Sequence, residues 1–362
     1  MNKGSKKSAV TTKPSKTVGL DIGDRYSYYC VLNADAELME EGRIRTTEEA
    51  LRRHFADSQR RRIALETGTH SPWISRLLQD LGQEVIVANA RKLESISASR
   101  TKNDRHDAEQ LARLAHSDPK LLSPVRHRSP ERQRDLNLIR ARSVLVRGRT
   151  MIINAARGLV KSSGGRLPSC SSQSFEEKVK ASLSAELADL VMPLLTQASS
   201  LSQQIKKMDQ RIDQLRERYA EIGILRSAPG VGPLVAATYV LTLDHHQLLR
   251  QSRSAGALLG LRPGQSQSGD YDPQCCITKT GNSYLRSLLI QSAQYILSRF
   301  GPDSALRKWG LKLAASGGKR GKKRAVVAVA RKLSVILHRM WRSGQRFLAF
   351  PQSAIAVAAV EA

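Results

Sequence analysis

Four carboxylates occupy positions from which side chains on different structural elements can converge. Asp21 follows a run of apolar and small residues, Glu66 directly follows the apolar residues 63–65, and Asp104 and Asp107 stand three residues apart. Residues three apart share one face of a helix, so the last two carboxylates can aim at one point. Clustered carboxylates repel one another unless cations neutralise them, and hard oxygen ligands suit Mg²⁺ or Mn²⁺. The four acids therefore predict a divalent-metal site, and a pair of such ions can clamp a scissile phosphate during phosphoryl transfer.

Each acid also has a purely structural explanation. Asp21 would suit a hairpin turn, where an Asp side chain hydrogen-bonds the nearby backbone. Asp104 would cap a helix and Asp107 would lie in its first turn, and both would interact favourably with the helix dipole. The order of the four acids along the chain favours metal binding for the set. The neighbouring His106 is expected to be an exposed helix residue rather than a ligand.

An alternation of strand-like and helix-like segments over residues 17–125 would position these acids. Apolar runs predict strands at 18–22, 26–32, 37–44, 62–65 and 84–88, and periodic segments predict helices at 48–55, 72–81, 90–97 and 105–116. Three consecutive strands followed by alternating helices and strands is the order of an RNase H-like α/β domain. In that order the first strand, the fourth strand and a late helix converge at one end of the sheet.

The composition favours an intracellular protein that binds nucleic acid. The 362 residues exceed one compact core, and 59 Lys and Arg against 32 Asp and Glu give a net charge of +27. Such a field attracts polyanions, with nucleic acid favoured over an anionic membrane, and no segment is apolar enough to span one. The four cysteines lack metal-ligand spacing, and residues 1–16 form a basic arm, expected to be disordered, without the apolar core of a signal peptide. The expected location is a reducing, intracellular one, the cytoplasm.

A long basic helix is predicted from Ser129-Pro130-Glu131 to about Val160, because Ser is a capping residue and Pro suits the first helical position. The helix carries seven arginines: Arg132, Arg134, Arg140, Arg142, Arg147, Arg149 and Arg157. A solvated charged face is the alternative explanation. Because acids are few here, the arginines are predicted to contact phosphates.

A heptad pattern follows between Leu187 and Tyr219, with Leu190 and Leu194 among its apolar positions and the polar Gln197 in one slot. Sustained spacing of this kind predicts a coiled coil. The partner is either the arginine-rich helix of the same chain or another subunit, and the pattern does not choose between them. Residues 126–221 are thus expected to form a helical spacer.

The C-terminal region, residues 222–346, is predicted to be mostly helical, with a tail at 347–362. Gly230 and Gly232 belong to an APGVGP turn that resembles the hairpin of a helix-hairpin-helix, where backbone N–H groups approach phosphate; a plain turn is the alternative. Ser266 and Ser268 lie in a turn-rich loop, and such a hydroxyl can attack phosphorus if cations stabilise the developing charge. Further cations are predicted to contact nucleic acid: Lys279, Arg286, Lys319, Arg320, Lys322, Lys323 and Arg324.

The motifs together resemble the DEDD-type insertion-sequence transposases of the IS110 family, from about residue 17 to 346. The motifs are, in chain order, GLDIG at 19–23, LETG at 65–68, KNDRHDAEQLA at 102–112, APGVGP at 228–233, GLRPGQSQSG at 260–269, TKTGN at 278–282 and GKRGKKRAVVAVARKL at 318–333. The resemblance implies a RuvC-like domain of RNase H fold, a coiled-coil spacer and a mostly α-helical C-terminal transposase domain.

The resemblance also implies a hybrid chemistry. Asp21, Glu66, Asp104 and Asp107 match the family's metal-binding tetrad, and Ser268, rather than Ser266, matches a serine that attacks DNA. The implied intermediate is a phosphoserine link to DNA, with strand exchange through a Holliday junction. The implied partners are donor and target DNA, a noncoding bridge RNA, and further copies of the chain, which form dimers that pair into a tetramer.

Two competing functions stay open at this point. The first is a RuvC-like, structure-specific endonuclease that cuts junctions with metal-activated water, in which Ser268 is only a loop residue. The second is a non-catalytic RNA- or DNA-binding protein with a degenerate site. An intact set of four acids argues against the second.

Overall fold

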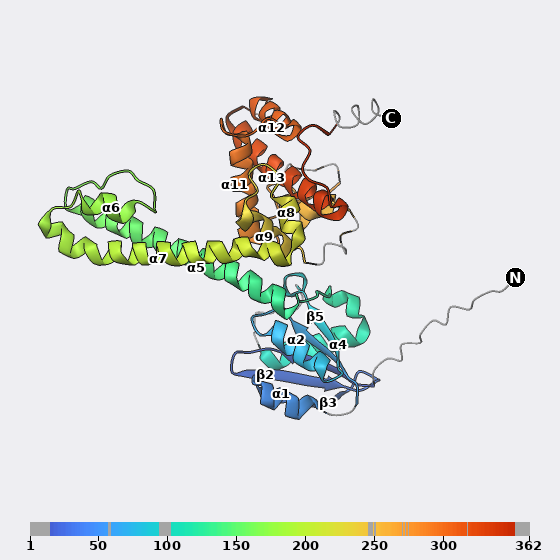
Figure 1. Cartoon of the computed structure of the whole chain (residues 1–362). Coiled ribbons are helices and arrows are strands. Elements are labelled where there is room, and N and C mark those ends of the chain that lie inside the picture. Colours follow the sequence, from blue (N-terminus) through green and yellow to red (C-terminus); the bar gives the residue numbers. More distant parts are fainter. Residues whose placement is uncertain are drawn as a thin grey trace. The chain divides into compact units, whose positions relative to one another are not determined.

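The computed structural model describes residues 15–56, 59–93, 103–244, 249, 251–269, 271, 273, 275–316 and 318–351, without the side chains of Arg91, Ala185 and Lys319 (Figure 1). The expected basic arm and the end of the expected tail lie largely outside these residues. The chain divides into two compact units, residues 1–128 and 129–362. Within the described residues, no helix has both the length and the apolar character needed to cross a membrane.

The first unit is built on a five-stranded mixed sheet with the order β3-β2-β1-β4-β5. The strands are β1 (Thr17–Asp21), β2 (Tyr26–Leu32), β3 (Leu38–Arg45), β4 (Arg62–Glu66) and β5 (Glu84–Ala88). β2 runs antiparallel to β1 and β3, whereas β4 runs parallel to β1 and β5. This is the order of an RNase H-like domain, so the predicted fold is confirmed.

Helices cover both faces of this sheet because its strands alternate their apolar side chains. Val18 and Leu20 of β1 pack with α1 (Glu48–Phe55) and α2 (Ser71–Asp80) on one face. On the other face, α4 (Asp104–Ser117) packs Ala108 and Ala112 against Cys30 and Leu32 of β2. Two short 3₁₀ turns, η1 (Ala90–Lys92) and η2 (Pro119–Leu122), also belong to the described part of this unit. Of the helix predicted at 90–97, the described part is η1 and Leu93, which ends the turn with φ −90° and ψ 58°; the rest lies outside the described residues.

The second unit begins with a long helical hairpin, α5 (Pro130–Ser162) and α7 (Ala185–Arg218), with the short α6 (Phe175–Lys180) between them (Figure 1). α5 and α7 pack along their lengths, so the heptad helix pairs with the arginine-rich helix of its own chain. The heptad register holds for the second half of α7, where Ile205, Ile212 and Leu215 are buried. In the first half it holds only in part, because Leu187 and Leu194 pack against the core, whereas Leu190 and Gln197 are exposed. Their expected core places are taken by Val191, Leu195 and Ala198.

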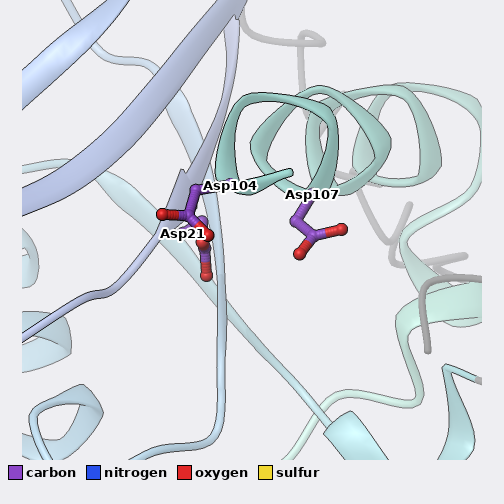
Figure 2. Close-up of side chains that lie close together, drawn as sticks. All are labelled: Asp21, Asp104 and Asp107. Atoms are coloured by element: carbon purple, nitrogen blue, oxygen red, sulfur yellow. The ribbon is translucent and has the colours of Figure 1, made fainter. Parts of the chain in front are cut away.

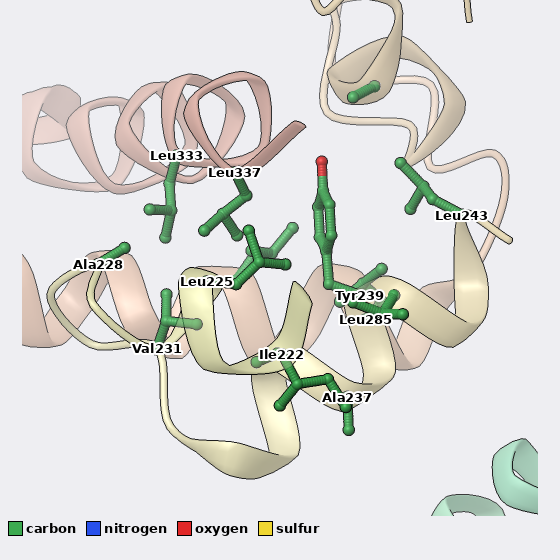
Figure 3. Close-up of a cluster of buried hydrophobic side chains, with 14 of the residues drawn as sticks. Ile222, Leu225, Ala228, Val231, Ala237, Tyr239, Leu243, Leu285, Leu333 and Leu337 are labelled. Carbon is green, nitrogen blue, oxygen red and sulfur yellow. The ribbon is translucent and has the colours of Figure 1, made fainter. Parts of the chain in front are cut away.

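The remaining helices share one large apolar core (Figure 3). They are α8 (Ala220–Leu225), α9 (Pro233–Thr242), α10 (Arg253–Leu258), α11 (Ser283–Leu297), α12 (Ala305–Ser316) and α13 (Gly318–Ser343). Tyr239 of α9 is fully buried at its centre, and its hydroxyl donates a 2.6 Å hydrogen bond to the Ser334 carbonyl of α13. Burial raises the pKa of Tyr239, so the hydroxyl stays protonated and the bond is maintained. The helical character predicted for this region is confirmed.

Candidate active site

Three aspartates meet at one edge of the sheet (Figure 2). Asp21 ends β1, and Asp104 and Asp107 lie in the first turn of α4. One carboxylate oxygen of each residue lies within 4.8 Å of the corresponding oxygens of the other two. Oxygens on opposite sides of a Mg²⁺ ion lie about 4 Å apart, since each bond is about 2.1 Å long. Small side-chain rotations would therefore suffice for the three carboxylates to hold one divalent cation.

The start of α4 reduces the repulsion between these carboxylates. Asn103, not Asp104, caps the helix, because the Asn103 Oδ1 atom accepts the Arg105 N–H at 3.1 Å. The capping explanation for Asp104 is therefore wrong, and its carboxylate is left for other partners. Among the described residues, neither Asp104 nor Asp107 forms an ion pair. The positive end of the helix dipole offsets part of their repulsion, and a bound cation would offset the rest.

Gly19 brings α4 close enough to β1 for the aspartates to meet. A Cβ atom at Gly19 would overlap the carbonyl oxygen of Ala108 and lie 2.5 Å from the Ala112 nitrogen, both in the backbone of α4. Any side chain there would push α4 away from the strand that carries Asp21. In the sequence, Gly19 stands out only as part of the GLDIG motif. The signal that would have revealed it is the pairing of a strand glycine with alanines spaced four apart on the facing helix.

Glu66 lies at the same edge of the sheet but outside the group of three. The parallel pairing of β1 and β4 places Leu20 beside Leu65, so Asp21 and Glu66 are each the next residue along. The carboxylate of Glu66 is not among those that approach within 4.8 Å. His106 is exposed, as expected, with its Nε2 atom 2.6 Å from Gln110 Nε2. The structure thus brings three acids together, and the fourth stays a prediction.

A polar chain that the sequence did not reveal joins the loops after β1 and β4. Trp73 Nε1–H donates to His70 Nδ1 at 3.0 Å, and His70 Nε2 lies 3.2 Å from Asp24 Oδ1. An indole nitrogen can only donate, so His70 Nδ1 is the acceptor and Nε2 faces the carboxylate. The contact between His70 and Asp24 links residues far apart in the sequence, and no local pattern predicts it. It ties together the two loops that follow Asp21 and Glu66.

Ser268 lies in the second unit, in a β-hairpin between α10 and α11. The Ser268 N–H donates to the Tyr271 carbonyl at 3.1 Å, and the Tyr271 N–H donates back to Ser268 at 3.1 Å. Gly269 follows with a φ of 56°, a conformation that favours glycine. Ser266 and Ser268 are both exposed, but the strand-like pairing includes Ser268. Among the described residues the Ser268 hydroxyl has no hydrogen-bond partner, so it is available to a ligand.

The arginines of α5 divide into two groups. Four direct their guanidinium groups to other segments of the chain, whereas Arg134, Arg140 and Arg147 are exposed, and Arg140 reaches only Asn137 of its own helix. The inward group makes these contacts: Arg132 to Asp244, Arg142 to Asp209, Arg149 to Ser202, and Arg157 to the Leu167 and Pro168 carbonyls. Burial opposes the charge of Arg142, but Asp209 outweighs it and raises the pKa. A solvated face and internal anchors thus coexist on one helix.

The other predicted contacts with nucleic acid are distributed over the C-terminal helices. Gly232 is the N-cap of α9, and Gly230, with a φ of 73°, lines a shallow groove beside it. Lys279 is exposed, whereas Arg286 donates to two backbone carbonyls. At the start of α13 the cations Arg320, Lys322, Lys323 and Arg324 are exposed. The side chain of Lys319 lies outside the described residues.

The sheet order and the acids at the ends of β1 and α4 define an RNase H-like domain, here followed by helical regions. Family comparisons agree with this class. A family of DEDD transposases of the IS110 type, described as transposase, matches residues 18–163, and the transposase family IS116/IS110/IS902 matches residues 223–308. Together the two matches cover more than half of the sequence. The chain belongs to the IS110 family of transposases.

Individual relatives are also named as transposases. The transposase for insertion sequence element IS1111A of Coxiella burnetii is 32% identical over 244 residues, which are 65% of this chain and 65% of that protein. A Pseudomonas aeruginosa protein named a probable family 20 transposase is 29% identical over 242 residues, 65% of this chain and 71% of its own length. A Sinorhizobium fredii protein named as a transposase, y4pF/y4sB, is 29% identical over 297 residues, 79% and 74% of the two chains.

Proposed function

We propose that the protein is the DNA transposase of an insertion sequence and that it cleaves and exchanges DNA strands with an acidic metal site and a serine nucleophile. The observation that carries the proposal is the convergence of Asp21, Asp104 and Asp107 at the end of β1. Glu66, at the same edge of the sheet, completes the tetrad. A site made only of carboxylates suits Mg²⁺ or Mn²⁺ and not a softer metal.

The acids serve to hold the cation and, through it, to orient a phosphate. When bound, such an ion neutralises charge on the phosphate and lowers the barrier to displacement at phosphorus. Asp21 and Asp107 are half-buried, which restricts their rotamers, whereas Asp104 is exposed. Mn²⁺ binding, followed by calorimetry, tests this role without DNA. Asp104→Asn is expected to weaken binding at least tenfold, and His106→Asn, two residues away and outside the cluster, is expected to leave it unchanged.

Ser268 supplies the nucleophile in this proposal. Its Oγ atom attacks the scissile phosphorus, an Oγ–P bond forms, and the bond from phosphorus to the leaving sugar oxygen breaks. The hydroxyl proton leaves to solvent or to a base, and the leaving oxygen takes up a proton. The resulting phosphoserine preserves the energy of the broken phosphodiester, so a second DNA hydroxyl can reverse the step and join new strands. Exposure and the paired strand position support Ser268 over Ser266.

A denaturing gel with labelled DNA tests the serine chemistry. Wild-type protein is expected to stay covalently attached to the cleaved strand, and Ser268→Ala is expected to abolish the attachment. Ser266→Ala is the matched control because this serine is exposed in the same loop; it should behave as wild type. Cleavage by Ser268→Ala with unattached products would refute the assignment.

Hydrolysis by a metal-activated water is the second candidate function. It is favoured by one observation: among the described residues, the Ser268 hydroxyl forms no hydrogen bond to a base. In that case the acidic site alone would cut a branched DNA structure, as a RuvC-like endonuclease does. The same gel separates the two functions, because hydrolysis leaves free phosphate ends and no attached protein.

The nucleic acid would be held by the outward arginines of α5, Arg134, Arg140 and Arg147, and by the exposed cations at the start of α13. The net charge of +27 exceeds what solubility requires. It suits a complex of donor DNA, target DNA and a noncoding bridge RNA whose loops select both sites. Dimers that pair into a tetramer would bring two DNA duplexes together.

RNA guidance has its own test. The protein is expressed with the DNA that flanks its gene, purified in high salt, and its bound RNA is sequenced. A single structured transcript from the flank is expected, and supplying it should make cleavage depend on its loop sequences. Cleavage of the same DNA site after complete RNase digestion would refute guidance and would leave the metal and serine proposals standing.

A further inference from the structure

The Ser268 hairpin is rooted in a tight contact between two backbone segments, residues 258–260 and 279–281. Gly260 and Gly281 have φ values of 65° and 72°, where side chains are disfavoured. A Cβ atom at Gly260 would lie 2.5 Å or less from backbone atoms of Thr280, and one at Gly281 would overlap the Leu258 carbonyl. The Lys279 N–H donates to the Gly260 carbonyl at 3.1 Å. We refer to these two segments as the hairpin root.

Arg286 holds both segments of the hairpin root at once. This residue lies in the first turn of α11, and its Nη1 atom donates to the Leu259 carbonyl at 3.0 Å and to the Thr280 carbonyl at 2.8 Å. One carbonyl belongs to the chain entering the hairpin and the other to the chain leaving it. Hydrogen bonds from a charged donor are stronger than neutral ones, so one side chain joins the two segments firmly.

The element that carries Arg286 is itself fixed. Asn282 caps α11 by accepting the N–H groups of Tyr284 and Leu285, at 3.0 and 3.1 Å, and its side-chain nitrogen donates to Thr242 of α9 at 3.2 Å. Leu285 is fully buried in the large core, and Leu259 in the hairpin root is 1% exposed. The root is therefore anchored to the core on both sides, while Ser268 itself is exposed.

The paired strands carry this anchoring toward Ser268. Beyond the root, the Thr278 N–H donates to the Arg262 carbonyl at 3.0 Å, and the Gly264 N–H donates to the Cys276 carbonyl at 2.8 Å. The Ser268–Tyr271 pair follows further along. Among the described residues these bridges are isolated and belong to no larger sheet, so a change in the root is expected to turn the end of the hairpin that carries Ser268.

We propose that Arg286 is a positioning residue that sets the direction of the Ser268 hairpin, and not a phosphate contact as the sequence suggests. The proposal rests on the serine chemistry proposed above. It also distinguishes Arg286 from the exposed Lys279, which leaves its ammonium group available to a ligand. Displacement at phosphorus demands alignment, and an angular error in a nucleophile lowers the rate without lowering affinity.

Arg286→Lys is the informative variant because it keeps the charge, while its shorter side chain does not bring the ammonium group to the position of Nη1, from which both carbonyls are held. We measure DNA affinity, its salt dependence, and the rate of covalent attachment at saturating DNA. The expected result is unchanged affinity and salt slope, with an attachment rate at least tenfold lower. Lys279→Ala is the control: it should weaken binding and flatten the salt slope but spare the rate at saturation. Wild-type attachment by Arg286→Lys, or a loss confined to affinity, would overturn the proposal.

Hydrogen exchange at the amides of Thr278 and Lys279 provides a readout that does not involve DNA. Exchange at these amides should accelerate in Arg286→Lys. It should also accelerate in Gly281→Ala, where the new methyl group would overlap the Leu258 carbonyl. The amides of β1 and α4 should exchange as in the wild type. Unchanged exchange would overturn the proposal that Arg286 holds the hairpin root, whatever the measurements of DNA affinity and covalent attachment show. If wild-type protein forms no covalent attachment at all, the proposed serine chemistry fails, and accelerated exchange would then leave Arg286 with a structural role alone.

Discussion

The two units of the chain position their chemistry by different physical means. In the first unit, Gly19 has no side chain, so α4 lies directly on β1, and Asp21, Asp104 and Asp107 meet through backbone proximity. In the second unit, charged side chains bridge segments: Arg286 joins the hairpin root, and Arg142 of α5 pairs with Asp209 of α7. The acidic cluster depends on one close backbone contact, whereas the Ser268 hairpin combines the glycine contacts of its root with an arginine anchor.

A basic sequence alone does not show which arginines hold the protein together and which bind nucleic acid. Arginine has a planar fork of donors that suits backbone carbonyls and carboxylates as well as phosphates. In a chain with 59 Lys and Arg, the residue type therefore does not separate anchors from nucleic-acid contacts. The direction in which each guanidinium group points separates the two roles. That direction depends on packing against residues that are distant in the sequence.

Asp21→Asn should have the largest effect, because it removes a charged ligand from the acidic cluster without changing its shape. DNA cleavage is expected to fall at least a hundredfold, while affinity for RNA and DNA changes little. Asp104→Asn should behave alike. Cleavage assays with Mg²⁺ and with Mn²⁺, alongside binding measurements, check this expectation. Full cleavage by either variant would remove the cluster from the mechanism.

Gly19→Ala tests whether the close packing of α4 on β1 brings the three aspartates together. The new methyl group would meet the backbone of α4, and overpacking of this kind costs about 1–3 kcal/mol. Both the melting temperature and Mn²⁺ affinity should fall, since α4 carries two of the three aspartates. Gly68→Ala, where a Cβ atom would meet nothing within 4 Å, is the matched control and should be nearly neutral. Equal behaviour of the two variants would contradict the account of Gly19.

Arg142→Ala and Arg147→Ala test whether inward-facing arginines anchor the second unit and outward-facing arginines do not. Arg142 is 18% exposed and hydrogen-bonds both oxygens of Asp209, so its loss should destabilise the second unit by about 1–3 kcal/mol. Arg147 is exposed, and its loss should leave stability unchanged while reducing the salt slope of nucleic-acid binding by about one. Urea unfolding and salt titrations measure the two effects. If both variants change the stability and the salt slope by the same amounts, the distinction between inward and outward arginines is wrong.

Tyr219 gives the smallest predicted effect. Its hydroxyl donates to Asp135 at 2.8 Å, and burial, followed by this bond, raises the pKa to about 12. A tyrosine in the unfolded chain titrates near pH 10, so the stabilisation is complete below about pH 10 and is lost as the pH rises toward 12. At pH 11 the loss is about 1 kcal/mol. Unfolding of wild type and Tyr219→Phe at pH 9 and pH 11 should show a steeper decline for the wild type; parallel declines would argue against the Asp135 contact.

Much of the fold was predictable because it follows from local patterns. The five strands appeared as apolar runs, and their ends in the structure agree within one residue or two. Asp104 and Asp107 were placed together because spacing on a helix is a local property. The register of α7 was predicted wrongly near Leu190, because leucines on two adjacent faces both fit a heptad and only contacts with α5 choose between them. The roles of Gly19 and Arg286 depend on residues distant in sequence, so local spacing does not reveal them.

The central claim is that the acids of the first unit and Ser268 of the second act in one cleavage event. Peptide mapping of the protein after reaction with DNA and complete nuclease digestion tests it most directly. The account predicts a nucleotide remnant on the peptide that contains Ser268 in the wild-type protein, and none in Asp21→Asn, although that variant retains Ser268. A remnant on Ser266 or on any other residue, or an unmodified protein together with cleaved DNA, would contradict it.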